Sequence, residues 1–250
     1  MSEASRSIVI ICEGPGDHRT VPGITDRVLS ASVDWMVPEM LAAYREWRGL
    51  KRNQPFLAWK QIHTIADEAG IRINGFFNGE PGAPDAFVAR RALALLKVVG
   101  EDPIDAVVLV RDSDTDKGRL KGLEQARAEV KNPNRPILIG VAHTKRECWV
   151  LAGFTPLDET EKAQLDALKQ ELGFDPCLHA EELTAQQDGA KRDAKRVLSL
   201  LTASSIDRES ACVKECSLQQ LEARGQNTGL AAFIQEIRTK LVPLWTGRAG

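Results

Sequence analysis

Three short apolar runs lie in the first two thirds of the chain, and each ends in polar or turn-forming residues. They span residues 7–12, 106–111 and 136–142 and are rich in valine and isoleucine. Continuous apolar runs of this length are typical of strands that are buried on both faces of a parallel sheet. A fourth segment, 70–77, alternates apolar and polar positions, which predicts a half-buried or edge strand. The pattern therefore predicts a sheet of about four strands.

Helical spacing of apolar residues occurs in several other segments, which are 86–99, 118–130, 159–172, 191–201 and 230–241. The first two separate predicted strands, whereas the other three follow the last strand. Strands that alternate with helices indicate an open α/β sheet with helices packed on it. We therefore predict an α/β protein with a Rossmann-like parallel sheet flanked by helices.

Two regions depart from this alternation. Segment 35–68 carries three tryptophans and one tyrosine at helical spacing, which favours an inserted helical lobe with these aromatic side chains in its core. After residue 155 the pattern is helical throughout. We expect residues 1–155 to form the α/β domain, with the insertion at about 35–68, and residues 156–250 to form a helical region that packs on the same domain.

Charge and composition narrow the classes of protein. The chain has 33 Lys and Arg residues against 35 Asp and Glu residues, so its formal net charge of −2 provides no overall attraction for nucleic acid or an anionic membrane. Any contact with a polyanion has to be local. No apolar run approaches the roughly 20 residues that span a bilayer, so we expect no membrane partner. The five cysteines include no CxxC pair and the first residues lack a signal-peptide pattern, which favours the cytoplasm.

Acidic residues follow the predicted strands. Glu13 ends the first strand, Asp112 and Asp114 follow the strand at 106–111, and Glu147 comes soon after the last strand. Because loops at the carboxyl ends of parallel strands meet at one edge of the sheet, these side chains are expected to converge. Their charges repel each other unless they are protonated or bind a cation, and carboxylate oxygens suit Mg²⁺ or Mn²⁺.

Asp17 and Asp116 are further candidate metal ligands. A structural alternative is that Asp17 caps a helix and that Asp114 or Asp116 caps the helix that begins near Lys117. The absence of a His and Cys cluster argues against zinc.

The acidic string at 112–116 allows other readings. It does not fit a calcium-binding EF-hand, since Lys117 and Leu123 stand where that loop needs Gly and Glu. A phosphatase of the haloacid dehalogenase type and a metal-dependent glycosyltransferase remain minor alternatives.

The order of the acidic motifs resembles that of a known family. A strand that ends in Glu13-Gly14, followed about a hundred residues later by a strand that ends in Asp112-x-Asp114, is similar to the TOPRIM domain of topoisomerases, primases, recombination-mediator proteins and OLD-type nucleases. The segment 147–151, Glu-Cys-Trp-Val-Leu, is similar to the Glu-x-Trp-Leu-Leu segment of small RloB-like and OLD-like TOPRIM proteins from bacterial defence loci.

The resemblance covers roughly residues 7–155 and is incomplete. Pro15-Gly16-Asp17-His18 replaces the commoner run after the first motif, although Asp17 keeps an acid four residues after Glu13. The resemblance implies a TOPRIM-like sheet in this part of the chain.

The resemblance also implies an activity. In TOPRIM proteins Mg²⁺ supports phosphodiester transfer or cleavage, so this chain is expected to be a Mg²⁺- or Mn²⁺-dependent nuclease or transferase that acts on DNA or RNA, with Glu13, Asp112 and Asp114 as catalytic acids. Glu13 is also a candidate general base. RloB-like and OLD-like enzymes place a lysine after the last acidic motif, and Lys191 is the best match.

Local basic residues and the TOPRIM resemblance also suggest partners. Candidate phosphate contacts are the basic residues Lys145, Arg146, Lys191, Arg192 and Lys195, for which the alternative is a solvated helix face. The chain has no GxxxxGK[ST] loop, so the resemblance implies a separate ATPase and the role of an effector subunit in bacterial anti-phage defence. Oligomeric state is left open. The alternative function is a non-catalytic subunit that binds metal or phosphate.

Overall fold

A parallel sheet forms the centre of the molecule, as the sequence pattern predicts. The computed structural model describes residues 5–101, 103–114, 116–130 and 135–247. The sheet has five strands in the order β2-β1-β6-β7, and β3 also pairs with β1. All of these pairs are parallel. The strands are β1 Arg6–Cys12, β2 Arg45–Arg48, β3 Leu57–Ala58, β6 Ala106–Asp112 and β7 Ile137–Ala142.

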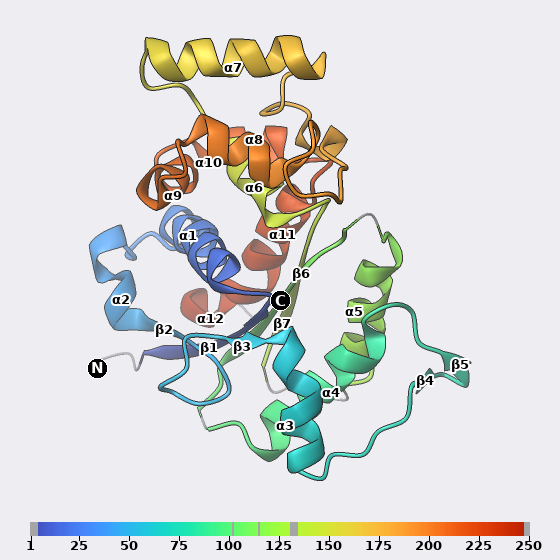
Figure 1. The fold of residues 1–250 in the computed structure, drawn as a ribbon. Coiled ribbons are helices and arrows are strands. Elements are labelled where there is room, and N and C mark those ends of the chain that lie inside the picture. Colours follow the sequence, from blue (N-terminus) through green and yellow to red (C-terminus); the bar gives the residue numbers. More distant parts are fainter. Residues whose placement is uncertain (1–4, 102, 115, 131–134, 248–250) are drawn as a thin grey trace.

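Helices cover both faces of the sheet (Figure 1). On one side, α1 Pro15–Ser32, α2 Leu41–Tyr44, α6 Arg146–Gly153 and α11 Leu230–Glu236 contact the strands. The helices that pack mainly on other helices of this side are α8 Ala194–Leu201, α9 Ile206–Lys214, α10 Leu218–Arg224, α12 Pro243–Thr246 and, outermost in Figure 1, α7 Glu159–Leu172. The other face carries α3 Ile62–Glu68, α4 Ala86–Val98 and α5 Gly118–Ala128. Single turns of 3₁₀ or π helix are η1 Pro38–Met40, η2 Trp59–Gln61, η3 Ala180–Glu182 and η4 Ile237–Leu241. None of the described helices is long and apolar enough to cross a membrane.

Strand β1 is an inner strand with both faces covered. Ile8 and Ile10 pack in the layer of α1, whereas Val9 and Ile11 pack in the layer of α4. This alternation follows from the two-residue repeat of a strand, and all four side chains are fully buried. Because both faces of β1 are buried, the strand cannot slide along its neighbours. Glu13, the residue after β1, is therefore held at the edge of the sheet.

The predicted strand at 70–77 is wrong. Only Phe76–Phe77 is a strand, β4, and it pairs antiparallel with β5 Glu80–Pro81 in a separate two-stranded sheet. The apolar positions Ile71 and Ile73 pack in the layer of α4 without joining the main sheet. Asn78 adopts a positive φ of 51°, which makes the turn of this hairpin and diverts the chain away from the main sheet.

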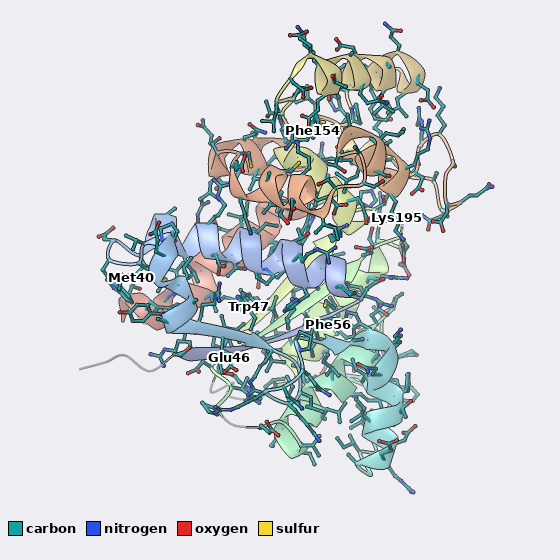
Figure 2. The ribbon with its side chains drawn as sticks, turned by 60° about the vertical axis from the view of Figure 1, so that its left-hand side comes forward. Met40, Glu46, Trp47, Phe56, Phe154 and Lys195 are labelled. Atoms are coloured by element: carbon teal, nitrogen blue, oxygen red, sulfur yellow. The ribbon has the colours of Figure 1, made fainter. Side chains whose placement is uncertain are left out.

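The predicted helical insertion at 35–68 is only partly helical, because it contains β2 and β3. Trp47 lies in β2 and Trp59 opens η2, so the spacing of the aromatic residues does not come from a single helix. Trp47 and Phe56 pack against the core of the α1 layer, and Phe56 lies beside His18 with 5.7 Å between ring centroids (Figure 2). The segment thus combines short helical turns with two short strands of the sheet.

The other predicted helices agree closely with α4, α5, α7 and α11 with η4. The helix predicted at 191–201 begins later, at Ala194, because the side chain of Asp193 caps it by accepting a hydrogen bond from the backbone N–H of Lys195. Lys191 therefore precedes α8, and its backbone carbonyl accepts a hydrogen bond from Arg196.

Candidate functional site

The sheet topology brings the predicted acidic residues to one place. Strands β1 and β6 are neighbours, and the connections from them run to opposite sides, so their carboxyl ends form the topological switch point of the sheet. Glu13 directly follows β1, and Asp112 is the last residue of β6. The two residues lie near each other, and the charge of Glu13 contributes to raising the pKa of Asp112. We call Glu13, Asp17, Asp112, Asp114 and Glu147 the acidic cluster.

Local structure holds Asp17 and Asp112 in place. Asp17 lies in the first turn of α1, where one of its carboxylate oxygens accepts hydrogen bonds from the backbone N–H groups of Glu13 and Gly14, both at 3.1 Å. Oδ1 of Asp112 accepts a hydrogen bond of 2.8 Å from the backbone N–H of Arg146, the first residue of α6. Asp17 thus caps α1, as the structural alternative proposed, while it also borders the other acids.

The acids raise each other's pKa. Burial raises the pKa of Asp112 to about 8, and the charges of Asp17, Glu13 and Glu147 act in the same direction. Burial also raises the pKa of Glu13, against the opposing effect of Arg111. The pKa of Asp17 is raised mainly by burial, despite its hydrogen bonds. The raised pKa values mean that burial and mutual repulsion disfavour the ionised form of these carboxylates.

Arginines compensate part of this charge. Arg111 forms ion pairs with Glu13 at 3.2 Å and with Asp85 at 3.0 Å. Arg119 pairs with Asp114 at 3.1 Å and also donates a hydrogen bond to the backbone carbonyl of Asp112. The more exposed acids of the cluster, Glu13 and Asp114, are therefore already paired with cations.

Glu147 is a buried member of this cluster, with 8% of its surface exposed. Its Oε1 accepts a hydrogen bond of 2.9 Å from Arg146, whereas its Oε2 is buried without a hydrogen-bond partner in the described part of the chain. Buried carboxylate oxygens without a hydrogen bond are unusual, because no interaction in the protein compensates for the loss of their hydrogen bonds to water. A divalent cation would supply the missing partner of this oxygen, because carboxylate oxygens are ligands of Mg²⁺ and Mn²⁺.

The geometry does not, however, contain a complete metal centre. Within the described ranges, no group of three or more His, Cys, Asp or Glu side chains is arranged to hold a metal ion. Asp116 is exposed, and its Oδ1 accepts a hydrogen bond of 2.8 Å from the backbone N–H of Gly118 at the start of α5. Asp116 lies just before Lys117, the N-cap residue of α5, and bonds to the first N–H of that helix, which is close to the structural alternative for it. For the five acids of the acidic cluster to bind a metal ion together, their carboxylates would have to move toward it.

The predicted basic residues fall into two groups. Lys145 and Arg146 are buried at the start of α6, whereas Lys191, Arg192 and Lys195 are exposed. The exposed position of Lys195 is visible in Figure 2. Only Lys191, Arg192 and Lys195 have the exposure expected of a solvated helix face.

Lys145 forms a buried ion pair of 3.1 Å with Asp193, whose side chain is 2% exposed. Asp193 also accepts hydrogen bonds from the backbone N–H groups of Gly189 and Lys195. Burial lowers the pKa of Lys145, but the hydrogen bond and charge of Asp193 outweigh it and leave the pKa raised. The pair thus fastens the segment that contains Lys191 to the start of α6.

Two polar residues near the cluster, Asp85 and Ser113, were not singled out from the sequence, whereas His143 was noted as the one histidine next to the acidic edge. Asp85 precedes α4 and pairs with Arg111, and Ser113 forms a hydrogen bond of 2.9 Å with Nδ1 of His143. Burial lowers the pKa of His143. Ser113 and His143 directly follow β6 and β7. Their positions after two predicted strands are the feature of the sequence that points to them. Nothing local marks Asp85, which is far in sequence from its partner.

Comparisons with protein-family models, with curated proteins and with solved structures give no match to this chain. The TOPRIM resemblance therefore rests on the motif residues alone.

The raised pKa of Asp112 predicts a pH-dependent stability. Because its pKa is near 4 in an unfolded chain and about 8 in the folded one, the folded protein binds an extra proton between these pH values. The free energy of unfolding should therefore fall as the pH rises through this range, by up to about 1.4 kcal/mol per pH unit. Urea unfolding without divalent ions should show a shallower fall for Asp112→Asn. The same slope in both proteins would contradict the burial of this charge.

The buried ion pair predicts a difference between two lysines. Lys145→Ala leaves Asp193 buried without its cation, so it should lower the free energy of unfolding by about 3 kcal/mol or more. Lys191→Ala changes an exposed side chain and should alter it by less than about 0.5 kcal/mol. Chemical denaturation of both variants measures this, and equal small effects would show that the pair contributes little.

Proposed function

We propose that this chain is a Mg²⁺- or Mn²⁺-dependent enzyme of TOPRIM type that cleaves or transfers phosphodiester bonds in DNA or RNA. The observation that carries the proposal is Asp112, a carboxylate surrounded by Asp17, Glu13 and Glu147 at the switch point of a parallel sheet. A protein whose only requirement was stability would gain by replacing one of these acids, because their mutual repulsion destabilises the fold. Acids retained in such an arrangement favour a functional role.

The residues that would hold the metal are Asp112, Glu147 and Glu13, joined by Asp114 when it leaves Arg119. A bound Mg²⁺ or Mn²⁺ would polarise the phosphate and lower the pKa of an attacking water molecule. Arg146 orients two of the acids, through its backbone N–H to Asp112 and its guanidinium to Glu147.

Glu13 is alternatively the proton acceptor of this site, in which case Asp112 and Glu147 would hold the metal without it. Its side chain is 37% exposed, so a substrate can reach it, and burial of the rest raises its pKa toward the range of a useful base. Arg111, which pairs with it, keeps the carboxylate in a fixed orientation.

The basic residues would then position nucleic acid. Lys191, Arg192 and Lys195 lie on one exposed stretch before and at the start of α8, and the Lys145–Asp193 pair ties this stretch to the acidic edge. This supports a role for Lys191 in neutralising phosphate charge, which stays a prediction. A separate ATPase and a role in anti-phage defence rest on the motif resemblance alone.

A second candidate is a non-catalytic subunit that binds metal or phosphate. It is favoured by the ion pairs of Glu13 with Arg111 and of Asp114 with Arg119, which neutralise two acids without a metal. In this case no phosphodiester bond is broken, and if the ligand is phosphate the arginine pairs persist when Mg²⁺ is added.

Cleavage of plasmid DNA and of RNA with Mg²⁺ or Mn²⁺ decides between the two candidates. Asp114→Asn keeps the size of the side chain but removes the charge that a metal needs, so it should abolish cleavage without unfolding the protein. Asp166→Asn, on the exposed face of α7, is the matched control and should retain it. Retained cleavage in folded Asp114→Asn would remove Asp114 from the site, whereas no cleavage by the wild type with either ion would favour the binding subunit.

A further inference from the structure

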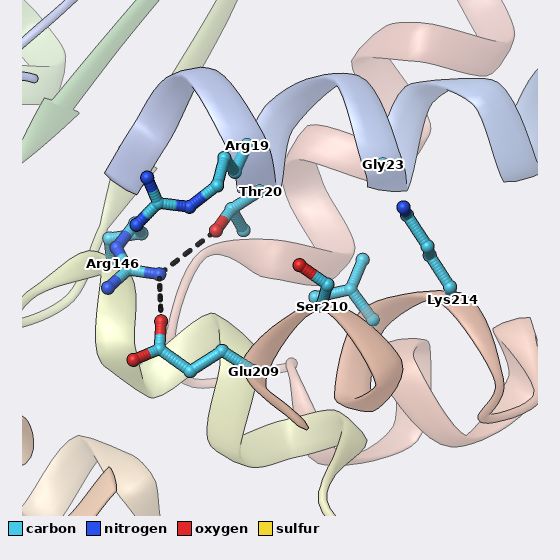
Figure 3. Close-up of a pocket in the computed structure, with 8 residues that line it drawn as sticks. Arg19, Thr20, Gly23, Arg146, Glu209, Ser210 and Lys214 are labelled. Carbon is cyan, nitrogen blue, oxygen red and sulfur yellow. Dashed lines mark hydrogen bonds and ion pairs between the residues drawn. The ribbon is translucent and has the colours of Figure 1, made fainter. Parts of the chain in front are cut away.

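A small cavity lies between α1 and α9, next to the first residue of α6. Its volume is about 180 Å³. The residues that line it come from three helices and are mostly polar or basic (Figure 3); they are Arg19, Thr20, Gly23, Arg146, Glu209, Ser210, Val213 and Lys214. It is built by packing between segments almost two hundred residues apart and is not part of the acidic cluster.

The lining of this cavity is positively charged. Arg19, Arg146 and Lys214 contribute three cations, and Glu209 contributes one carboxylate. Arg146 is paired, but neither Arg19 nor Lys214 has an ion pair or side-chain hydrogen bond with any described residue. By contrast, Arg45 forms an ion pair with Asp26 of α1. Both side chains are exposed, so an anion at the cavity could bind them without breaking an existing ion pair.

Arg146 is held in a fixed position at one end of the cavity. It is 9% exposed, and its guanidinium donates to Thr20 at 3.1 Å, to Glu209 at 3.3 Å and to Glu147 at 2.9 Å. Figure 3 shows the guanidinium of Arg19 beside it. A side chain at Gly16 would come within 2.8 Å of Nε of Arg146, so the glycine leaves the room that this arginine occupies. A donor fixed in this way needs little reorganisation to bind an anion.

Hydroxyl groups complete the site. Thr20 accepts a hydrogen bond from Arg146, which leaves its own O–H free to donate to a ligand. Ser210 projects its oxygen toward the cavity from α9 (Figure 3). Arginine, lysine and hydroxyl donors around one space are typical of phosphate recognition.

We propose that this cavity binds a phosphate group. Its volume is smaller than the 300–1,000 Å³ or so of pockets for whole organic ligands, so it suits the phosphate and leaves the remainder of the molecule outside. The phosphate belongs either to a nucleic-acid backbone or to a small phosphorylated molecule. The proposal does not depend on metal binding or cleavage at the acidic cluster, although Arg146 contacts both places.

Calorimetric titration of the protein with inorganic phosphate, at low salt and without divalent ions, tests the proposal. Arg19→Ala and Lys214→Ala should each weaken binding by about 10-fold, the effect of losing one charge-assisted hydrogen bond. Glu209→Gln removes the only negative charge of the lining and should strengthen binding several-fold. Lys121→Ala, an exposed lysine of α5 on the other face of the sheet, is the matched control and should have no effect.

The source of the phosphate is resolved by repeating the titration with a single-stranded oligonucleotide at several salt concentrations. If the cavity binds a backbone phosphate, Lys214→Ala should weaken oligonucleotide binding and reduce the slope of log affinity against log salt by about 0.7. If it binds a small phosphorylated molecule, only phosphate binding should change. Wild-type affinities for both ligands in Arg19→Ala, Lys214→Ala and Glu209→Gln, with folding verified by circular dichroism, would overturn the proposal.

Discussion

The repulsion between carboxylates at the carboxyl ends of β1 and β6 is the constraint on which the rest of the site depends. Parallel pairing of these strands places Glu13 beside Asp112, and the start of α1 adds Asp17. Burial on both faces of the sheet prevents the strands from shifting to relieve the contact. The protein therefore needs positive charge here, supplied by protonation, by arginine or by a bound cation.

Arginine provides part of that charge, and its placement links the site to the remainder of the fold. Arg111 and Arg119 pair with the outer acids, whereas Arg146 reaches Glu147 and the cavity between α1 and α9. The same buried guanidinium therefore borders both the acidic cluster and the basic cavity. On the function proposed above, cations beside the carboxylates would offset their repulsion of an anionic phosphodiester.

The sequence predicted the features that depend on local pattern. Apolar runs located β1, β6 and β7, and the polar residues that follow them located Glu13 and Asp112, because a strand's end fixes where the next side chain lies. Strand β2 was missed because Arg45-Glu-Trp-Arg48 is mostly charged. Arg48 is tolerated in the sheet only because Ser7 and backbone carbonyls accept its hydrogen bonds, which requires the tertiary structure.

The partners of the charged groups were also beyond the sequence. Lys145 was expected to face a phosphate, but it pairs with Asp193, 48 residues away. The cavity with Arg19 and Lys214 exists only after α1 and α9 pack together. Helical periodicity predicts that each helix has a buried face, and it does not predict which faces meet.

The central claim is that the acidic cluster binds a divalent cation. Anomalous diffraction from crystals of the protein soaked with Mn²⁺ tests it most directly, because the signal locates the ion itself. The account predicts a peak within about 2.2 Å of carboxylate oxygens of Asp112 and of Glu147 or Glu13, with the Arg119–Asp114 pair broken or rearranged. Mn²⁺ bound only elsewhere on the protein, with both arginine pairs of the cluster intact, would contradict it.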